Sequence, residues 1–238
     1  MENKVCIVIP SYNTKSSINK SITGILKYMP NVRVIVVDDN SPDGTARFIK
    51  SKFGLDPRVT LIVRKQKGGR GSAVIRGFKE GLKNKNTKFF IEMDADLCHD
   101  PKYLPILIKK CQEYDVVIAS KYLKGSVIIG LGLKRLIFSR IVNFYIRLML
   151  GIRITDYTNG YRCYTRKTLE KINFKNISSR GFIVLSEIAY NIYKEGFTFG
   201  EIPIFFKYKN MNPSNFNLSE IKEAFFTILR LRFKLKRL

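Results

Sequence analysis

The 238-residue chain has little of what would bind zinc or hold a disulfide framework. Its four cysteines, Cys6, Cys98, Cys111 and Cys163, are far apart and form no C-x-x-C pair. This spacing argues against a zinc site and against a set of disulfides, and it fits a reducing cytosol.

Long uncharged apolar runs are also missing. The best candidate for a membrane span, residues 141–152, is short and carries Arg147, whereas a spanning helix needs about 20 predominantly apolar residues. The N-terminus enters an apolar segment at once, without the successive regions of a signal peptide. The sequence therefore predicts a protein that is soluble or peripheral to a membrane.

Acidic residues are scarce relative to basic ones. The chain has 43 Lys and Arg against 19 Asp and Glu, a formal net charge of +24. Such an excess attracts polyanions such as nucleic acid, anionic lipid headgroups or phosphorylated substrates; a solvated basic surface without a specific partner explains the charge equally well. Residues 230–238 alternate five cations with apolar side chains, which suits an anionic membrane surface and also complements a helix dipole.

Apolar runs alternate with helical patterns along the chain, which predicts an α/β fold with a mostly parallel sheet in a single domain. The expected strands are residues 5–10, 32–37, 58–64, 89–93, 115–120 and 198–206. The expected helices are residues 16–29, 44–52, 72–82, a segment opening at Pro101, 134–150, 183–194 and a terminal helix from about 218, and residues 156–162 are expected to be rich in turns.

Two expected strands end in carboxylates. Asp94 and Asp96 follow residues 89–93, and Asp38 and Asp39 end the second strand. Open α/β folds bind ligands at the carboxyl ends of their strands, and carboxylate oxygens suit Mg²⁺ or Mn²⁺ shared with substrate phosphates. One D-x-D pair is a weak signal, but the second acidic strand end makes a pattern and predicts a metal site at Asp94 and Asp96.

Two further segments have both a structural and a functional interpretation. Residues 68–71 (GGRG) open a helix, where glycine backbone and a helix N-terminus favour phosphate, although such turns are common. Residues 134–150 are apolar except for a few positions, with Arg140, Asn143 and Arg147 expected to form one narrow polar stripe. We expect most apolar side chains of this helix to be buried; the alternative is an interfacial helix that dips into a bilayer.

Eight segments taken together resemble inverting nucleotide-sugar transferases with the GT-A fold, most closely the dolichyl- or polyprenyl-phosphate mannosyltransferases. They are IPSYNT (9–14), VVDDNSPDGT (36–45), RKQKGGRGSA (64–73), DADLCHDP (94–101), VVIASKY (116–122), KRLIFSR (134–140), TDYTNGYRCY (155–164) and EIPIFF (201–206). The resemblance implies a Rossmann-like αβα sandwich with a mostly parallel central sheet and peripheral amphipathic helices. Residues 1–215 would form the GT-A catalytic domain and 216–238 a basic amphipathic helix of the same unit.

The resemblance also implies roles for individual residues. The nucleotide sugar would be bound by Pro10, Tyr12, Asp38, Asp39, Lys67, Ala95 and Lys209, and the Mg²⁺ or Mn²⁺ ion by the catalytic Asp94 and Asp96. The acceptor phosphate would contact Lys121, Arg135 and Ser139, and the sugar side would be formed by Asp156, Asn159 and Arg162. Helix capping is the preferred role for Asn40 and Ser41, and a structural role is preferred for His99.

The implied reaction moves mannose from GDP-mannose to a membrane polyprenyl phosphate with inversion. A phosphate monoester has its second pKa near ~6 and is largely a dianion at neutral pH, so it attacks without a general base. The implied partners are a nucleotide-diphosphate sugar, a polyprenyl phosphate and an anionic membrane surface, with the protein cytoplasmic and peripheral on the cytoplasmic face. No nucleic acid is expected, because many aromatic residues lie in apolar runs rather than among the basic residues.

Five positions depart from the family pattern and leave the donor open. Thr14 replaces a common Glu, Cys98 a Ser or Gln, Lys121 and Lys209 replace arginines, and Asn215 replaces a lysine. Residues 40–43 (NSPD) favour the mannosyl branch by resemblance. The alternatives are UDP-glucose, UDP-N-acetylglucosamine or another acceptor, and, from other classes, a nucleic-acid-binding protein or an inactive scaffold.

Overall fold

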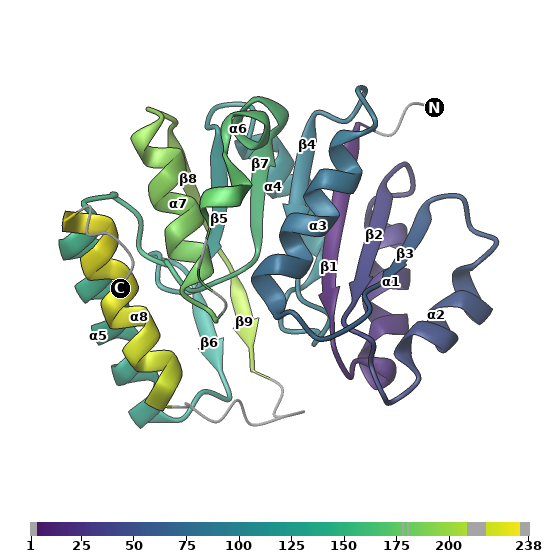
Figure 1. Ribbon diagram of the computed structural model, residues 1–238, viewed down its shortest axis with the longest axis horizontal. Helices are drawn as coiled ribbons and strands as arrows, with labels where there is room; N and C mark the ends of the chain where they lie inside the picture. The colour runs from purple at the N-terminus through teal and green to yellow at the C-terminus, as the bar shows by residue number, and fades with distance from the viewer. Residues whose placement is uncertain (1–3, 178, 180, 209–217, 234–238) are drawn as a thin grey trace.

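The computed structural model describes residues 4–177, 179, 181–208 and 218–233 (Figure 1). A seven-stranded sheet lies at its centre in the order β3-β2-β1-β4-β7-β5-β8. The strands are β1 (Val5–Ser11), β2 (Arg33–Asp38), β3 (Val59–Val63), β4 (Phe89–Glu92), β5 (Val116–Ser120), β7 (Arg162–Thr165) and β8 (Phe199–Pro203). Neighbours are parallel except where β7 pairs with β4 and β5, which confirms the expected fold class.

Helices cover both faces of this sheet and bury two apolar clusters. They are α1 (Lys15–Tyr28), α2 (Thr45–Phe53), α3 (Arg70–Leu82), α4 (Leu104–Lys110), α6 (Arg166–Lys171) and α7 (Val184–Lys194). Successive residues of β1 alternate between the clusters: Cys6 and Val8 belong to one, Ile7 and Ile9 to the other. Because a strand alternates its side chains, two covered faces require the uninterrupted apolar run that the sequence shows.

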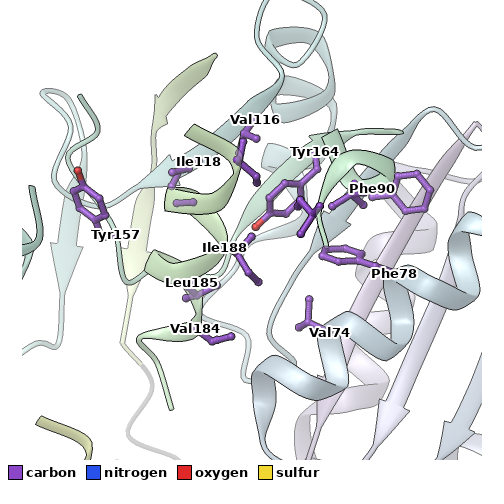
Figure 2. Packing of buried hydrophobic residues seen from close by; sticks show 14 of the residues in the cluster. Val74, Phe78, Phe90, Val116, Ile118, Tyr157, Tyr164, Val184, Leu185 and Ile188 are labelled. Carbon is purple, nitrogen blue, oxygen red and sulfur yellow. The ribbon is translucent and has the colours of Figure 1, made fainter. Parts of the chain in front are cut away.

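Aromatic rings join α3 to the middle of the sheet (Figure 2). Phe78 of α3 meets Phe90 of β4 and Tyr164 of β7 edge to face, with ring centroids 6.3 and 5.4 Å away. Such pairs add to the free energy gained from burial alone. This packing fixes α3, and with it the glycine-rich segment at its start, against β4.

Strand β7 is the main element that the sequence did not predict. It begins at Arg162, whose side chain is fully buried. The guanidinium donates to the backbone carbonyls of Tyr157, Asn159 and Leu185 at 2.8 Å each. Since these acceptors come from a loop and a helix, nothing in the local sequence indicates that a strand accommodates this arginine.

A second layer lies beside β8, at the left of Figure 1. It contains α5 (Leu133–Leu150), α8 (Leu218–Phe233) and a small parallel pair, β6 (Val127–Ile129) and β9 (Phe205–Lys207). The expected strand 198–206 is therefore split at Ile204 between two sheets. Helix α8 packs against α5 and α7, with Tyr145 and Phe225 stacked at a centroid distance of 5.6 Å.

Two 3-10 helices, η1 (Pro101–Tyr103) and η2 (Phe174–Asn176), complete the described elements. The helix expected at Pro101 begins as η1 and continues as α4, and the Asp100 carboxylate caps it by accepting from the Lys102 amide at 3.0 Å. Lys209, Asn215 and the last five residues of the basic tail lie outside the described residues.

Candidate functional site

Both acid pairs lie at the carboxyl end of the sheet, where β1, β2 and β4 are neighbours. Ser11 pairs in register with Asp38, and Val8 with Glu92, two residues before Asp94. This register brings the two acidic strand ends to the same end of the sheet.

Asp38 is fully buried and its hydrogen bonds are internal. Its carboxylate accepts from the Ser11 hydroxyl at 3.0 Å and from the amide and hydroxyl of Ser41 at 2.8 and 2.6 Å. Asp38 therefore ties the end of β1 to the turn after β2. The expected helix-capping role of Asn40 and Ser41 is wrong: Ser41 donates to the Asp38 carboxylate, Asn40 donates to the Lys65 carbonyl, and the residue before α2 is Gly44.

Asp39 organises the glycine-rich segment. Its carboxylate accepts from the amides of Gly68 and Gly69 at 3.1 and 3.0 Å and pairs with Arg64. Gly69 has φ 87°, a backbone conformation that favours glycine. Two amides that the sequence offered to a phosphate are thus directed at Asp39, so this acid shapes the loop that opens α3.

Tyr12 and Lys67 form the accessible part of the expected nucleotide site. The Tyr12 side chain is 38% exposed, and Lys67 Nζ lies 4.0 Å from its ring centroid. Pro10 is half-buried beside them. Ala95 is buried, and its carbonyl accepts from the Ser21 hydroxyl at 3.0 Å, which anchors the acid pair to α1.

Asp94 and Asp96 each use one oxygen internally. Asp94 Oδ1 accepts from Arg70 Nε at 2.8 Å, and Asp96 Oδ1 accepts from the Cys98 amide at 3.0 Å. Burial would raise the pKa of Asp94, but the charge and hydrogen bond of Arg70, together with other nearby groups including Lys121, outweigh it and hold that pKa below its usual range. Leu97, which follows Asp96, has φ 65°, which is rare for a residue with a side chain.

Two carboxylates alone make an incomplete metal site. Within residues 4–177, 179, 181–208 and 218–233, no group of three or more His, Cys, Asp and Glu side chains is placed to hold an ion. The oxygens that remain are hard donors suited to Mg²⁺ or Mn²⁺, which usually keep waters and substrate phosphates as further ligands. The residues present therefore fit a divalent ion that is shared with a diphosphate.

His99 is committed to structure. Its Nδ1 accepts from the Asp94 amide at 3.0 Å, and Nε2 lies 2.8 Å from Asn159 Oδ1. Because Nδ1 is an acceptor, Nε2 carries the proton and donates to Asn159, so the ring is neutral. The His99 ring also stacks on the Tyr161 ring, with 4.8 Å between the ring centroids. These contacts give His99 the structural role preferred from the sequence.

The sugar-side residues are buried supports. Asp156 is fully buried and binds Lys121 Nζ at 3.0 and 3.2 Å. Asn159 joins His99 to the Ala119 carbonyl, and Arg162 is buried at the start of β7. Glu201 of β8 accepts from the Thr155 and Asp156 amides. This segment is therefore held rigidly beside the acid pair.

Two of the three expected acceptor residues, Arg135 and Ser139, lie in the N-terminal half of α5, and Lys121 follows β5. Ser139 accepts from the Tyr122 hydroxyl at 2.6 Å, next to Lys121. Arg135, one turn earlier, donates to the Tyr208 hydroxyl, and its guanidinium lies 4.4 Å from that ring's centroid. Lys121 is 11% exposed. Ser139 is thus joined through Tyr122 to the segment that carries Lys121, and Arg135 lies one turn away on the same helix.

Helix α5 also carries an exposed apolar face, defined as Leu133, Ile137, Ile141, Phe144 and Leu148. These side chains are 50–71% exposed, whereas Ile146 and Leu150 are buried. Lys134, Arg140 and Arg147 are exposed around it and Asn143 is buried. The polar residues therefore do not form one stripe: Asn143 faces inward and the cations flank the apolar face. None of the described helices is long and apolar enough to cross a bilayer.

Sequence reasoning missed several residues of the site. Arg70, Glu92, Tyr122, Glu201 and Tyr208 hold the expected residues in place. Glu92 offered a signal, because a carboxylate inside an apolar strand needs a buried partner.

Comparison with known proteins identifies the family. The family model described as "Glycosyl transferase family 2" matches residues 6–173. The chain belongs to glycosyl transferase family 2. It is 34% identical to the polyprenol monophosphomannose synthase of Mycolicibacterium smegmatis, over 94% of this chain and 85% of that protein. It is 33% identical to the undecaprenyl-phosphate mannosyltransferase of Micrococcus luteus, over 95% of this chain and 93% of that protein.

Solved structures agree with this family 2 fold. Glucosyl-3-phosphoglycerate synthase from Mycobacterium tuberculosis, with Mn²⁺, UDP and glucosyl-3-phosphoglycerate, superposes with a TM-score of 0.69 at 18% identity, over 99% of this chain and 81% of that chain. A mannosyltransferase from Pyrobaculum calidifontis, with GDP-Man and Mn²⁺, superposes with a TM-score of 0.65 at 16% identity, over 97% of this chain and 65% of that chain. The expected GT-A glycosyltransferase fold and the expected family are confirmed.

Proposed function

We propose that this chain transfers mannose from GDP-mannose to a polyprenyl phosphate, with inversion at the anomeric carbon. The observation that carries the proposal is the identity of 33–34%, over nearly the whole chain, to two proteins named as mannosyltransferases of polyprenyl phosphates. The Pyrobaculum mannosyltransferase bound to GDP-Man shares the fold. Residues 1–215 form the proposed catalytic domain, and 216–238 a basic helix of the same unit.

Asp94 and Asp96 would hold the divalent ion through the oxygens that their internal hydrogen bonds leave free. When bound, Mg²⁺ or Mn²⁺ supplies charge that stabilises the departing diphosphate. Because the chain offers two carboxylates at this point, a diphosphate and water would have to supply the remaining ligands. We therefore expect tight metal binding to require the nucleotide.

Arg135 and Ser139 would bind the acceptor phosphate, and Lys121 would add positive charge beside them. The phosphate dianion needs no general base, which is compatible with a His99 ring whose two nitrogens are both occupied. The task of the protein is then to hold the phosphate in line with the anomeric carbon and to exclude water.

The apolar face of α5 supports a lipid acceptor. Ser139 and Arg135 lie on the same helix as Ile137 and Ile141, whose side chains are 50% and 60% exposed. A helix that buries such a face among lipids while its cations meet phosphate headgroups lies in the membrane plane. We place the protein peripherally on the cytoplasmic face of an anionic membrane.

A lipid-extraction assay tests the proposal. Purified protein is incubated with Mn²⁺, polyprenyl phosphate in liposomes and radiolabelled GDP-mannose, UDP-glucose or UDP-N-acetylglucosamine. We expect label in the organic phase from GDP-mannose alone, its loss with EDTA, and its return with excess Mn²⁺. Label that stays in water contradicts the lipid acceptor, and equal transfer from UDP-glucose contradicts the donor.

A further inference from the structure

Arg70 joins three parts of the site that are distant in sequence. It is the first residue of α3, at the end of the glycine-rich segment. Its Nε donates to Asp94 Oδ1 at 2.8 Å, one terminal nitrogen donates to Glu92 Oε2 at 3.1 Å, and the other donates to the Gly160 carbonyl at 3.4 Å. The planar guanidinium is therefore fixed on three sides.

Glu92 balances the charge of Arg70. It lies in β4 with no exposed surface, and its other oxygen accepts from the Tyr164 hydroxyl at 2.5 Å. A buried carboxylate requires a cation or several hydrogen bonds, and Arg70 is the cation paired with it. Arg70 is shared by Glu92 and Asp94, so one cation faces two carboxylates and a net negative charge remains to attract a metal ion.

Arg70 also determines which Asp94 oxygen faces outward. It occupies Oδ1, whereas Oδ2 accepts no hydrogen bond from the part of the chain that the structure describes. The contact to Oδ2 is His99 Nε2 at 3.9 Å, whose proton goes to Asn159. The Asp94 side chain is 32% exposed, and Oδ2 is the oxygen that the internal hydrogen bonds leave available for a metal ion.

We propose that Arg70 is a positioning residue for the metal site: it fixes Asp94 as a one-oxygen ligand and couples the glycine-rich segment to the acid pair. The proposal rests on the proposed function, because it takes the divalent ion to bind at Asp94 and Asp96. Arg70 acts through Asp94 and need not touch the ion or the substrate.

Gly160 provides the space that this arrangement needs. A Cβ on Gly160 would lie 1.8 Å from a terminal nitrogen of Arg70, far inside any allowed contact. Its φ is not positive, so its backbone accepts alanine. Gly160→Ala would therefore displace the guanidinium while it leaves every charge in place.

The test measures Mn²⁺ and GDP binding separately in the whole chain. Arg70→Met/Glu92→Gln removes one positive and one negative charge, so the local net charge is unchanged. We expect the Kd for Mn²⁺ at saturating GDP to rise about 10-fold or more, as for other partners that orient metal ligands. We expect the Kd for GDP without metal to stay within about twofold, whereas general structural damage would weaken both.

Two further variants complete the design. Gly160→Ala should weaken Mn²⁺ binding in the same direction with no charge removed, and it serves if the double variant does not fold. Arg166→Met/Glu170→Gln removes a pair whose arginine binds the Leu82, Asn84 and Thr87 carbonyls, away from the acid pair, and should leave both Kd values unchanged.

The outcomes separate the two proposals. A wild-type Kd for Mn²⁺ in a folded Arg70→Met/Glu92→Gln or Gly160→Ala variant overturns the role of Arg70. Absence of GDP-dependent Mn²⁺ binding to the wild-type protein, with UDP tested in parallel, overturns the proposed metal site itself.

Discussion

The carboxyl end of β1, β2 and β4 differs from the surface of α5 in its side chains: the first has buried, hydrogen-bonded acids and the second has exposed apolar residues. Asp38 and Asp39 are buried, with internal donors on their carboxylates. On α5, Phe144 and Leu148 are 69% and 70% exposed among the residues that the structure describes. In the first region the polar groups are satisfied by partners within the protein. In the second, the apolar side chains remain exposed and would be buried only by contact with another apolar environment.

We propose that this difference corresponds to two kinds of ligand. A charged, water-soluble donor requires prearranged polar groups, because unpaired buried charges are costly. A lipid acceptor requires exposed apolar surface on the protein, because burying such surface in lipid is favourable by about 25 cal/mol per Å². Lys121, Arg135 and Ser139 lie between the two regions, where a phosphate attached to a lipid would meet the donor.

The largest expected effect comes from a substitution in the polar region at the carboxyl end of the sheet. Asp96→Ala removes one of the two carboxylates that we propose hold the metal ion as charge develops on the leaving diphosphate, and we expect transfer to lipid to fall about 10³-fold. The measurement is initial rate of organic-extractable label. Glu113→Ala is the matched control, since this exposed acid pairs only with Lys110 on the surface. Activity of Asp96→Ala within tenfold of wild type would contradict the assignment.

The next prediction concerns the junction between the regions. Burial would raise the pKa of Asp156, but the charge and hydrogen bonds of Lys121 outweigh it and hold this pKa below its usual value. A carboxylate with a lowered folded pKa contributes stability above its unfolded pKa of about 3.9, and this contribution is lost as pH falls through the folded pKa.

Lys121→Met should reverse this pH dependence. Without the cation, burial raises the folded pKa of Asp156 above its unfolded value, so the contribution is present at low pH and is lost as pH rises. We expect roughly 3 kcal/mol of destabilisation at pH 7 and less near pH 4, measured by urea unfolding. Lys124→Met, at an exposed lysine, is the control. A loss that is equal at both pH values would disprove the pairing argument.

The smallest expected effect concerns the apolar region. Ile141→Glu or Phe144→Glu should lower sedimentation with anionic liposomes about 10-fold. The melting temperature should not change, because both side chains are at least 60% exposed. Leu55→Glu is the control, since Leu55 is fully exposed between α2 and β3. Unchanged pelleting of both α5 variants would refute membrane contact through this face.

Much of the fold could be predicted because its information is local. The run from Val5 to Pro10 indicates a strand covered on both faces, and Asp94 and Asp96 at a strand end indicate a ligand site. The features that the sequence did not predict depend on partners that are distant in sequence. The Arg70–Glu92 pair spans 22 residues, and Arg162 is tolerated in β7 because carbonyls elsewhere bind it.

The exposure of α5 could not be read from its pattern either. A helix with a wide apolar sector is compatible with burial or with a membrane, and only the position of α8 decides which residues are covered. Helix α8 takes the side with Tyr145 and Ile146, so Ile137 and Phe144 stay outside.

The direction of β7 has a consequence for variation within the fold. Arg162 pairs with Glu92 and Thr165 with Phe89, so this strand starts where its neighbours finish. The loop that enters β7 is thereby delivered to the ligand-binding end of the sheet. We expect that substitutions in residues 155–161 can retune which sugar is accepted while the strands beneath keep their alignment.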